Sequence, residues 1–241
     1  IYGFANSKPA SARNQGELEK ERSGMAIYSL SHSSVGRSTH RAGTAGAHAR
    51  YITRWRAASA VLGEHMPMGT KAASTWLDRQ EVSDRKNARV IDKLMVALPR
   101  ELATSQRLEL VRRFLWRIGF GRISWLAAIH DQGEDAHNPH AHILIRDRDI
   151  ETGRRVAQLS EKGSTRKLRK LWEDEVNLAL EKAGQTARID CRSLRDQGID
   201  RLPQRHQGPK RRFRKPNNPS FPTVHRDFRL AKTAPERRSG K

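Results

Sequence analysis

Two apolar segments with a short polar loop between them constrain the fold of this chain more than any other feature. The segments are RISWLAAIH (122–130) and HAHILIRD (140–147), and the loop 131–139 between them ends in Asn138-Pro139. Apolar runs of this length, bounded by polar residues, are typical of strands, and an Asn-Pro pair favours a turn. The two segments therefore predict neighbouring strands of an antiparallel hairpin, with the loop joining their ends.

Further segments predict the elements around this hairpin. We expect strands over 25–30 and in the apolar run that stops at Pro99, and helices over 47–62, 102–118 and 163–184. Thr104 or Ser105 should cap the second of these helices. Ser164 or Thr165 should begin the third helix, which should end at Gly184. The sequence contains no internal repeat, and its 241 residues favour one folded domain.

Four of the ten histidines of the chain lie in the hairpin region. Side chains alternate along a strand, so His140 and His142 should share one face while Ala141 points to the other. His130 ends the neighbouring strand and should lie across from that pair. Three imidazoles at this range would form half of a coordination sphere for one metal ion, with positions left open for a substrate. The spacing alone also allows solvated histidines on an edge strand, and His137 in the loop should lie outside the cluster.

The charge of the chain indicates the class of its partner. The net charge is +21 and the isoelectric point is about 11.1. A field of this sign favours polyanions, nucleic acid first and anionic membranes second. No apolar run is long enough to span a bilayer, and residues 1–24 lack the apolar core of a signal peptide. The single cysteine, Cys191, excludes a disulfide framework and a zinc finger.

Composition divides the chain into three parts. Residues 1–24 are polar and without pattern, so we expect a disordered leader there, with Met25 as a candidate start of the protein. Residues 25–209 should form the folded domain. Residues 203–241 carry twelve Lys and Arg against two acidic residues, so we expect 210–241 to be a disordered basic tail.

Tyr51 is the candidate nucleophile among the three tyrosines. Tyr2 lies in the polar leader, and Tyr28 lies in the expected first strand, where a role in the core is the default. Positive charge favours phenolate, because a phenol with a pKa of about 10 is a poor nucleophile. An amphipathic tyrosine on a basic helix is the alternative. Between residues 23 and 63 there is no acidic side chain, and the five arginines there are candidates for holding DNA phosphates: Arg37, Arg41, Arg50, Arg54 and Arg56.

Several stretches together resemble the MobA/MobL family of plasmid mobilization proteins, which are His-hydrophobic-His relaxases. The resemblance rests on MAIYSLS near the start, GTAGAHARYITR around Tyr51, VALPREL, NPHAHIL, and the segment from RKLWEDEV to RLPQRHQGP. It extends from about Met25 to Pro209. It implies an α+β fold with a central antiparallel sheet flanked by helices, as in relaxases and rolling-circle initiators.

The resemblance also implies an activity and its partners. The expected enzyme is a site- and strand-specific endonuclease and transesterase that nicks plasmid DNA at an origin of transfer. Tyr51 would attack a phosphodiester and stay linked to the 5′ end, and His130, His140 and His142 would bind Mg²⁺ or Mn²⁺. The implied partners are plasmid DNA that is melted or single-stranded at the nick, accessory mobilization proteins and the conjugative coupling machinery, and the implied location is the bacterial cytoplasm.

The chain departs from the family in the strand before ALP. Relatives commonly have acidic residues there, whereas this chain has Lys93 and Met95. Asp92 is the nearest remaining carboxylate in that strand. Asp131 and Asp135, beside the first histidine, are further candidates for orienting a metal-bound imidazole, with solvated loop acids as the alternative.

Three other classes of protein stand beside the mobilization relaxase. A rolling-circle replication initiator uses the same histidine and tyrosine chemistry, and only the flanking motifs favour mobilization. A non-enzymatic DNA- or RNA-binding protein would explain the charge but not the histidines. A histidine-triad nucleotide hydrolase would need a third alternating histidine, and this chain has Leu144 at that position.

Overall fold

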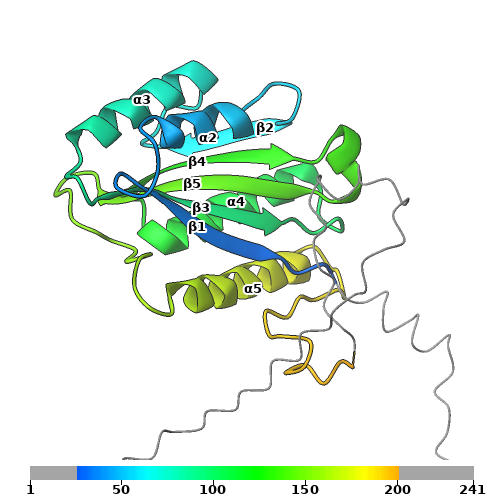
Figure 1. Cartoon of the computed structure of the whole chain (residues 1–241). Coiled ribbons are helices and arrows are strands. Elements are labelled where there is room, and N and C mark those ends of the chain that lie inside the picture. The colour runs from blue at the N-terminus through cyan, green and yellow to red at the C-terminus, as the bar shows by residue number, and fades with distance from the viewer. Residues whose placement is uncertain (1–25, 201–241) are drawn as a thin grey trace, which may run out of the picture.

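The chain folds around one antiparallel sheet of five strands in the order β1-β3-β5-β4-β2 (Figure 1). The computed structural model describes residues 26–200. The expected α+β architecture, a central antiparallel sheet flanked by helices, is confirmed. The elements are β1 (Leu30–Gly36), α2 (Thr44–Ile52), β2 (Ala60–Glu64), α3 (Thr70–Ser83), β3 (Arg89–Ala97), α4 (Thr104–Gly119), β4 (Ile123–His130), the 3₁₀ turn η1 (Gly133–His137), β5 (His140–Asp149) and α5 (Ser164–Lys182).

The predicted hairpin lies inside this sheet. β4 and β5 pair antiparallel, with His130 opposite His140 and Ala128 opposite His142. β3 pairs with the other side of β5, where Met95 lies opposite His142. Every residue of β4 is buried. This explains the continuous apolar run in the sequence of β4, because both faces of the strand are covered.

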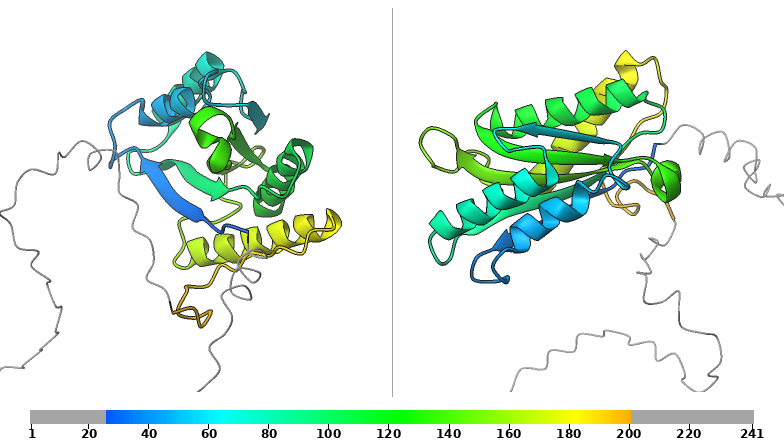
Figure 2. Two further views of the ribbon diagram at one scale, coloured as in Figure 1. Left: turned by 90° about the vertical axis from the view of Figure 1, so that its right-hand side faces the viewer. Right: turned by 90° about the horizontal axis from the view of Figure 1, so that it is seen from above.

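Helices cover both faces of the sheet (Figure 2). α2 and α3 lie on one face, where Ala49, Leu77 and Leu144 belong to one buried apolar cluster. α4 and α5 lie on the other face, where the rings of Phe114 and Trp172 meet edge to face with centroids 4.8 Å apart. The sheet therefore separates two cores, and alternate residues of its central strands belong to different cores.

A buried ion pair connects the end of α3 with β5. The guanidinium of Arg146 donates two hydrogen bonds to the carboxylate of Asp84, at 2.8 and 2.9 Å. It also donates to the Val90 carbonyl at 3.3 Å. The side chains of Arg146 and Asp84 are only 9% and 8% exposed, so each charge depends on the other for compensation.

The predictions for the longer elements are confirmed. β3 occupies the apolar run before Pro99, and α4 and α5 occupy the expected segments. α5 begins at Ser164 and is followed by Gly184, whose φ of 68° is the left-handed conformation that ends a helix. The predicted cap of α4 is wrong, because the N-cap residue is Ala103. Its N–H donates to the side-chain oxygen of Gln106 at 2.8 Å, which satisfies one of the free donors at this helix end.

Two predictions for the N-terminal third of the domain are wrong. The first strand is Leu30–Gly36, not 25–30. Ala26 instead donates its N–H to the Arg188 carbonyl at 3.2 Å, beside the segment that follows α5. The helix expected over 47–62 ends at Ile52, because residues 60–64 pair with β4 as the edge strand β2 and this pairing outweighs the helix propensity of the alanines.

The structure also contains an element that the sequence did not predict. α3 packs on α2 and buries Ala73 and Leu77. Within residues 26–200, none of the helices combines the length and the apolarity needed to cross a bilayer. The expected leader 1–24, with Tyr2, and the expected tail 210–241 lie outside the described residues.

Candidate active site

Three histidines meet on the face of the sheet that α2 and α3 cover. His130 is the last residue of β4, and His140 and His142 are the first and third residues of β5. Their ring centroids lie 4.8 to 5.2 Å apart, and one nitrogen atom from each lies within 4.8 Å of the others. The structure thus brings together the three side chains that strand alternation selects, while His137 lies exposed in the loop turn η1.

Backbone carbonyls fix two of these rings. His130 donates Nε2–H to the Ile52 carbonyl at 2.8 Å, and His140 donates Nδ1–H to the Asn138 carbonyl at 2.8 Å. A carbonyl only accepts hydrogen bonds, so each bonded nitrogen carries a proton, and the second ring nitrogen is the one that can offer a lone pair to a metal. Metal-binding histidines are commonly held in this way. The donor set therefore fits a metal ion.

Burial favours the neutral form of two of the three histidines. It lowers the pKa of His142 from 6.5 to about 4, and the neighbouring His130 and His140 contribute to the same direction. Burial also lowers the pKa of His130, against the effect of its hydrogen bond to Ile52. Only the neutral form of an imidazole binds a metal ion. At neutral pH these two side chains are already in that form and can become ligands without releasing a proton.

Tyr51 and one histidine of the cluster, His142, open into the same hollow. Tyr51 lies in the last turn of α2 and is 53% exposed. It lines a hollow of about 240 Å³ together with His142. The guanidinium carbon of Arg54 lies 4.0 Å from the centre of the Tyr51 ring, so a positive charge stands next to the phenol. Because the next residue, Ile52, bonds to His130, the end of α2 is tied to the cluster.

Tyr28 has a different environment. It packs on the core under α4 and α5, and its buried hydroxyl has no hydrogen-bond partner among the described residues. Burial raises its pKa, which disfavours phenolate. Of the two described tyrosines, only Tyr51 is placed to act as a nucleophile at the histidine cluster.

A lysine and a histidine form a pair in the hollow that the sequence analysis did not identify. Lys93 donates Nζ–H to Nε2 of His48 at 3.0 Å, and both line the hollow or its wall beside Tyr51. Burial lowers the pKa of both groups, and the charge of Lys93 lowers that of His48 further. The one signal in the sequence is that His48 and Tyr51 are three residues apart, hence neighbours on one helix face. No carboxylate of the described residues lines this hollow.

The three acidic candidates have different surroundings. Asp92 lies on the opposite face of the sheet, where it accepts hydrogen bonds from His32 and Arg89, both at 2.8 Å. Strand alternation is the reason: Lys93 points to the histidine face and its neighbour therefore cannot. The expectation that Asp92 orients a ligand histidine is therefore wrong.

The other two acids follow β4. Asp131 pairs with Arg107 of α4 at 3.3 Å. The carboxylate of Asp135 lies 4.0 Å from Nδ1 of His130. It raises the pKa of that imidazole, against the stronger effect of burial. Of the three candidates, Asp135 is therefore the one that the structure brings to the cluster.

The candidate DNA-binding arginines divide into two groups. Arg54 and Arg56 lie in the turn after α2, Arg54 over the ring of Tyr51 and Arg56 over that of Trp55. Arg41 is exposed. The other two bond to α3 and its end: Arg50 to the hydroxyl of Ser74 and Arg37 to the carbonyl of Asp84.

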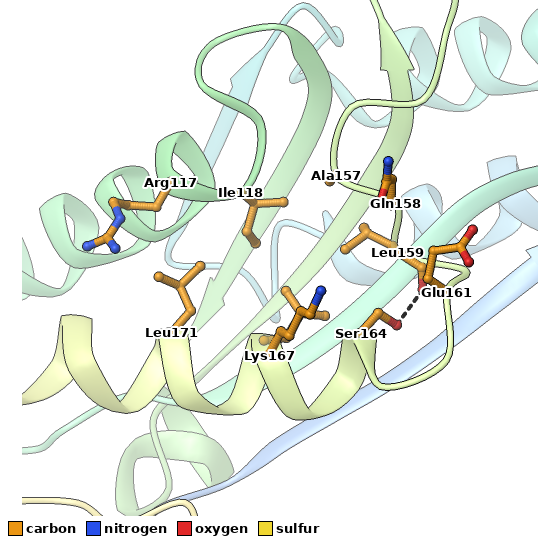
Figure 3. Close-up of a pocket in the computed structure, with 10 residues that line it drawn as sticks. Arg117, Ile118, Ala157, Gln158, Leu159, Glu161, Ser164, Lys167 and Leu171 are labelled. Carbon is orange, nitrogen blue, oxygen red and sulfur yellow. Dashed lines mark hydrogen bonds between the residues drawn. The ribbon is translucent and has the colours of Figure 1, made fainter.

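Two further hollows lie away from the histidines. One, of about 260 Å³, lies between α4, α5 and the segment before α5 (Figure 3). Arg117, Lys167 and Leu171 line it, and Ser164 closes one side by donating to the Leu159 carbonyl at 2.8 Å. The other, of about 680 Å³, lies beside the buried Arg146. Neither hollow is lined by Tyr51 or by a residue of the histidine cluster.

Comparisons of the sequence with known proteins identify relatives of this chain. Mobilization protein A of Escherichia coli is 33% identical over 214 residues, which cover 77% of this chain and 30% of that protein. The 43 kDa relaxation protein of Salmonella typhimurium is 32% identical over 215 residues, covering 73% of this chain and 56% of that protein. The chain thus spans less than two thirds of the length of these relatives.

A solved structure shares the fold. The structure described as "Molecular Basis of Vancomycin Resistance Transfer in Staphylococcus aureus" superposes with a TM-score of 0.54 at 20% sequence identity, covering 70% of this chain and 100% of that one. The model of the MobA/MobL family matches residues 45–215, which include Tyr51 and all three clustered histidines. This chain belongs to the MobA/MobL family.

Proposed function

We propose that this chain is a plasmid mobilization relaxase, which nicks and rejoins one strand at an origin of transfer. The observation that carries the proposal is the hollow shared by Tyr51 and His142, a member of the cluster of three imidazoles. A nucleophile and a phosphate-binding centre must face the same space for an in-line attack. Residues 25–209 are proposed as the nicking domain, with 1–24 and 210–241 as flanking segments.

In the proposed reaction the Tyr51 oxygen attacks the phosphorus of one phosphodiester. The phenol loses its proton, the bond from phosphorus to the 3′ oxygen breaks, and that oxygen takes up a proton as a free 3′-hydroxyl. The new bond links Tyr51 to the 5′-phosphate. Because one phosphoester replaces another, the reverse attack by a 3′-hydroxyl rejoins the strand without ATP.

His130, His140 and His142 would hold the metal ion, with His130 and His140 oriented by the carbonyls of Ile52 and Asn138. The carboxylate of Asp135 lies 4.0 Å from Nδ1 of His130, the nitrogen left for the metal, and would add negative charge beside the ion. A bound divalent ion would supply positive charge to a non-bridging phosphate oxygen. Of Mg²⁺ and Mn²⁺, we expect Mn²⁺ to fit better, because Mg²⁺ binds mainly through oxygen while a first-row transition metal accepts imidazole nitrogen.

Basic side chains around Tyr51 would bind the DNA. Arg54 lies over the phenol ring and would offer its charge to a phosphate beside Tyr51. Arg41 and Arg56 would contact phosphates of the strand, which positions the DNA without reading its sequence. The proposed partners are therefore plasmid DNA, single-stranded at the nick, and beyond it the mobilization and coupling proteins of a bacterial cytoplasm.

The test is a relaxation assay on the supercoiled plasmid that carries the coding sequence together with its flanking DNA. With Mn²⁺ we expect open circles whose 5′ ends carry protein, and Tyr51→Phe should abolish both products. Tyr28→Phe is the matched control and should nick like the wild type, because its hydroxyl bonds to no described residue. Nicking that survives in Tyr51→Phe, or DNA binding without any nicking by the wild type, would reject the proposal.

A further inference from the structure

Trp55 is the most exposed aromatic side chain among residues 26–200, with 82% of its surface open to solvent. It lies in the turn that follows α2, four residues after Tyr51. An indole left in water contributes almost none of its apolar surface to the core. The stability of the fold therefore does not explain a tryptophan at this position.

The turn that carries Trp55 is held at both ends. On one side Thr70 donates its hydroxyl to the Thr53 carbonyl at 3.1 Å. On the other side Ser59 donates its N–H to the Ile129 carbonyl at 2.8 Å. Trp55 is thus presented by a fixed segment of backbone, and a partner would lose little conformational entropy by docking on it.

The same turn leads from the nucleophile to the histidine cluster. Ile52 accepts the hydrogen bond of His130, and Arg54 lies over the ring of Tyr51. A strand bound at the cluster would therefore pass this turn.

The chemistry around Trp55 selects the kind of partner. Arg56 lies over one face of the indole, with its guanidinium carbon 4.9 Å from the ring centre, and the second face has no described aromatic or cationic partner. No acidic residue occurs between positions 23 and 63. An apolar protein surface would have to bury the neighbouring arginines, whereas an unpaired nucleotide offers a π face for the indole and a phosphate for the guanidinium.

We propose that Trp55 is a stacking platform for an unpaired base of the DNA strand held at the histidine cluster, with Arg56 on an adjacent phosphate. The proposal rests on the proposed function, because it assumes that the strand held at the histidine cluster is single-stranded DNA. Stacking on an aromatic side chain tolerates any base, so the platform would position the strand rather than read its sequence.

The test measures binding without cleavage. In a Tyr51→Phe background with EDTA, fluorescence anisotropy gives the affinity for a fluorescein-labelled dT20 and for a 20-mer of abasic tetrahydrofuran phosphates. Trp55→Ala should weaken dT20 binding about 5- to 150-fold and leave abasic binding nearly unchanged, while Trp55→Phe should retain most of the affinity. Segment 203–241 is present in every variant, and its phosphate contacts cancel in the ratio of the two affinities.

Trp116→Ala is the matched control. Trp116 is 53% exposed on α4, on the opposite side of the sheet, and should not affect either affinity. The proposal is overturned if Trp55→Ala leaves dT20 binding intact, weakens both oligonucleotides equally, or acts no differently from Trp116→Ala. Nicking by the wild type is measured separately, so loss of the platform and loss of the proposed function give different results.

Discussion

The buried state of His142 makes the stability of the metal-free protein depend on pH. In the folded state burial lowers the pKa of this imidazole from 6.5 to about 4. The unfolded chain therefore takes up a proton near pH 6.5, and the folded protein does so only near pH 4. The stabilisation is fully present above pH 6.5 and is lost as the pH falls towards 4, because protons bind preferentially to the unfolded state. His142→Asn, which is neutral and similar in size, removes this contribution.

The magnitude follows from the two pKa values. For one group that titrates at 6.5 when unfolded and at about 4 when folded, the loss between pH 6.5 and 4.5 is about 2 kcal/mol. His142 keeps some contact with solvent, which screens the effect, so we expect about 1 to 2 kcal/mol. His130 and His48 have pKa values shifted in the same direction, and both remain in the variant.

Urea unfolding in EDTA at pH 6.5, 5.5 and 4.5 checks this expectation. The free energy of unfolding of the wild type should fall more steeply than that of His142→Asn, and the difference should grow by about 1 to 2 kcal/mol over this interval. The denaturant slope should be the same in both proteins, so that the difference reports stability alone. Two parallel pH profiles would refute the conclusion that His142 is held neutral by burial.

Three further predictions concern charge. Arg146→Met should lower the free energy of unfolding by about 3 to 5 kcal/mol in urea titrations, because it leaves the buried carboxylate of Asp84 unpaired. Arg192→Met, which removes an exposed ion pair, is the control and should lower it by less than about 1 kcal/mol. Lys93→Met should slow plasmid nicking about 100-fold, because it removes a desolvated cation from the hollow, and it should not lower the urea midpoint. A parallel loss of stability would indicate that Lys93 has a structural role instead. In calorimetry on Tyr51→Phe, dT20 should tighten Mn²⁺ binding at least about 5-fold, and equal affinities with and without DNA would contradict this linkage.

The central hairpin was predictable because its signals are local. The apolar runs, the Asn-Pro turn and the alternation of His140, Ala141 and His142 all lie within residues 122–147. β2 was not predictable in the same way. Its alanine and leucine favour a helix locally, and only the hydrogen bonds with β4 make it a strand. α3 was missed because it buries only one narrow side, around Ala73 and Leu77, and most of its other positions are polar.

The candidate site likewise has residues that the sequence predicts from local patterns and contacts that depend on the tertiary structure. The sequence selects the three histidines and Tyr51, because strand alternation and the run of arginines need no tertiary information. The bond from His130 to the Ile52 carbonyl could not be predicted, since a backbone carbonyl carries no sequence signal and the partners are 78 residues apart. The same holds for Lys93 and His48, which the packing of α2 on β3 brings within 3.0 Å.

Lys93 and Met95, at positions where the family resemblance leads us to expect acidic residues, can be interpreted only with the structure. The resemblance suggests that a carboxylate should lie in this strand, and by sequence Asp92 is the nearest one. Strand alternation places Asp92 on the far face instead, so the hollow beside Tyr51 contains an ammonium and no described carboxylate. A half-buried cation without a counter-ion is costly, and a metal ion in the histidine cluster would add to that cost. A DNA phosphate would offset both, which is the physical reason to expect that metal and DNA stabilise one another in this site.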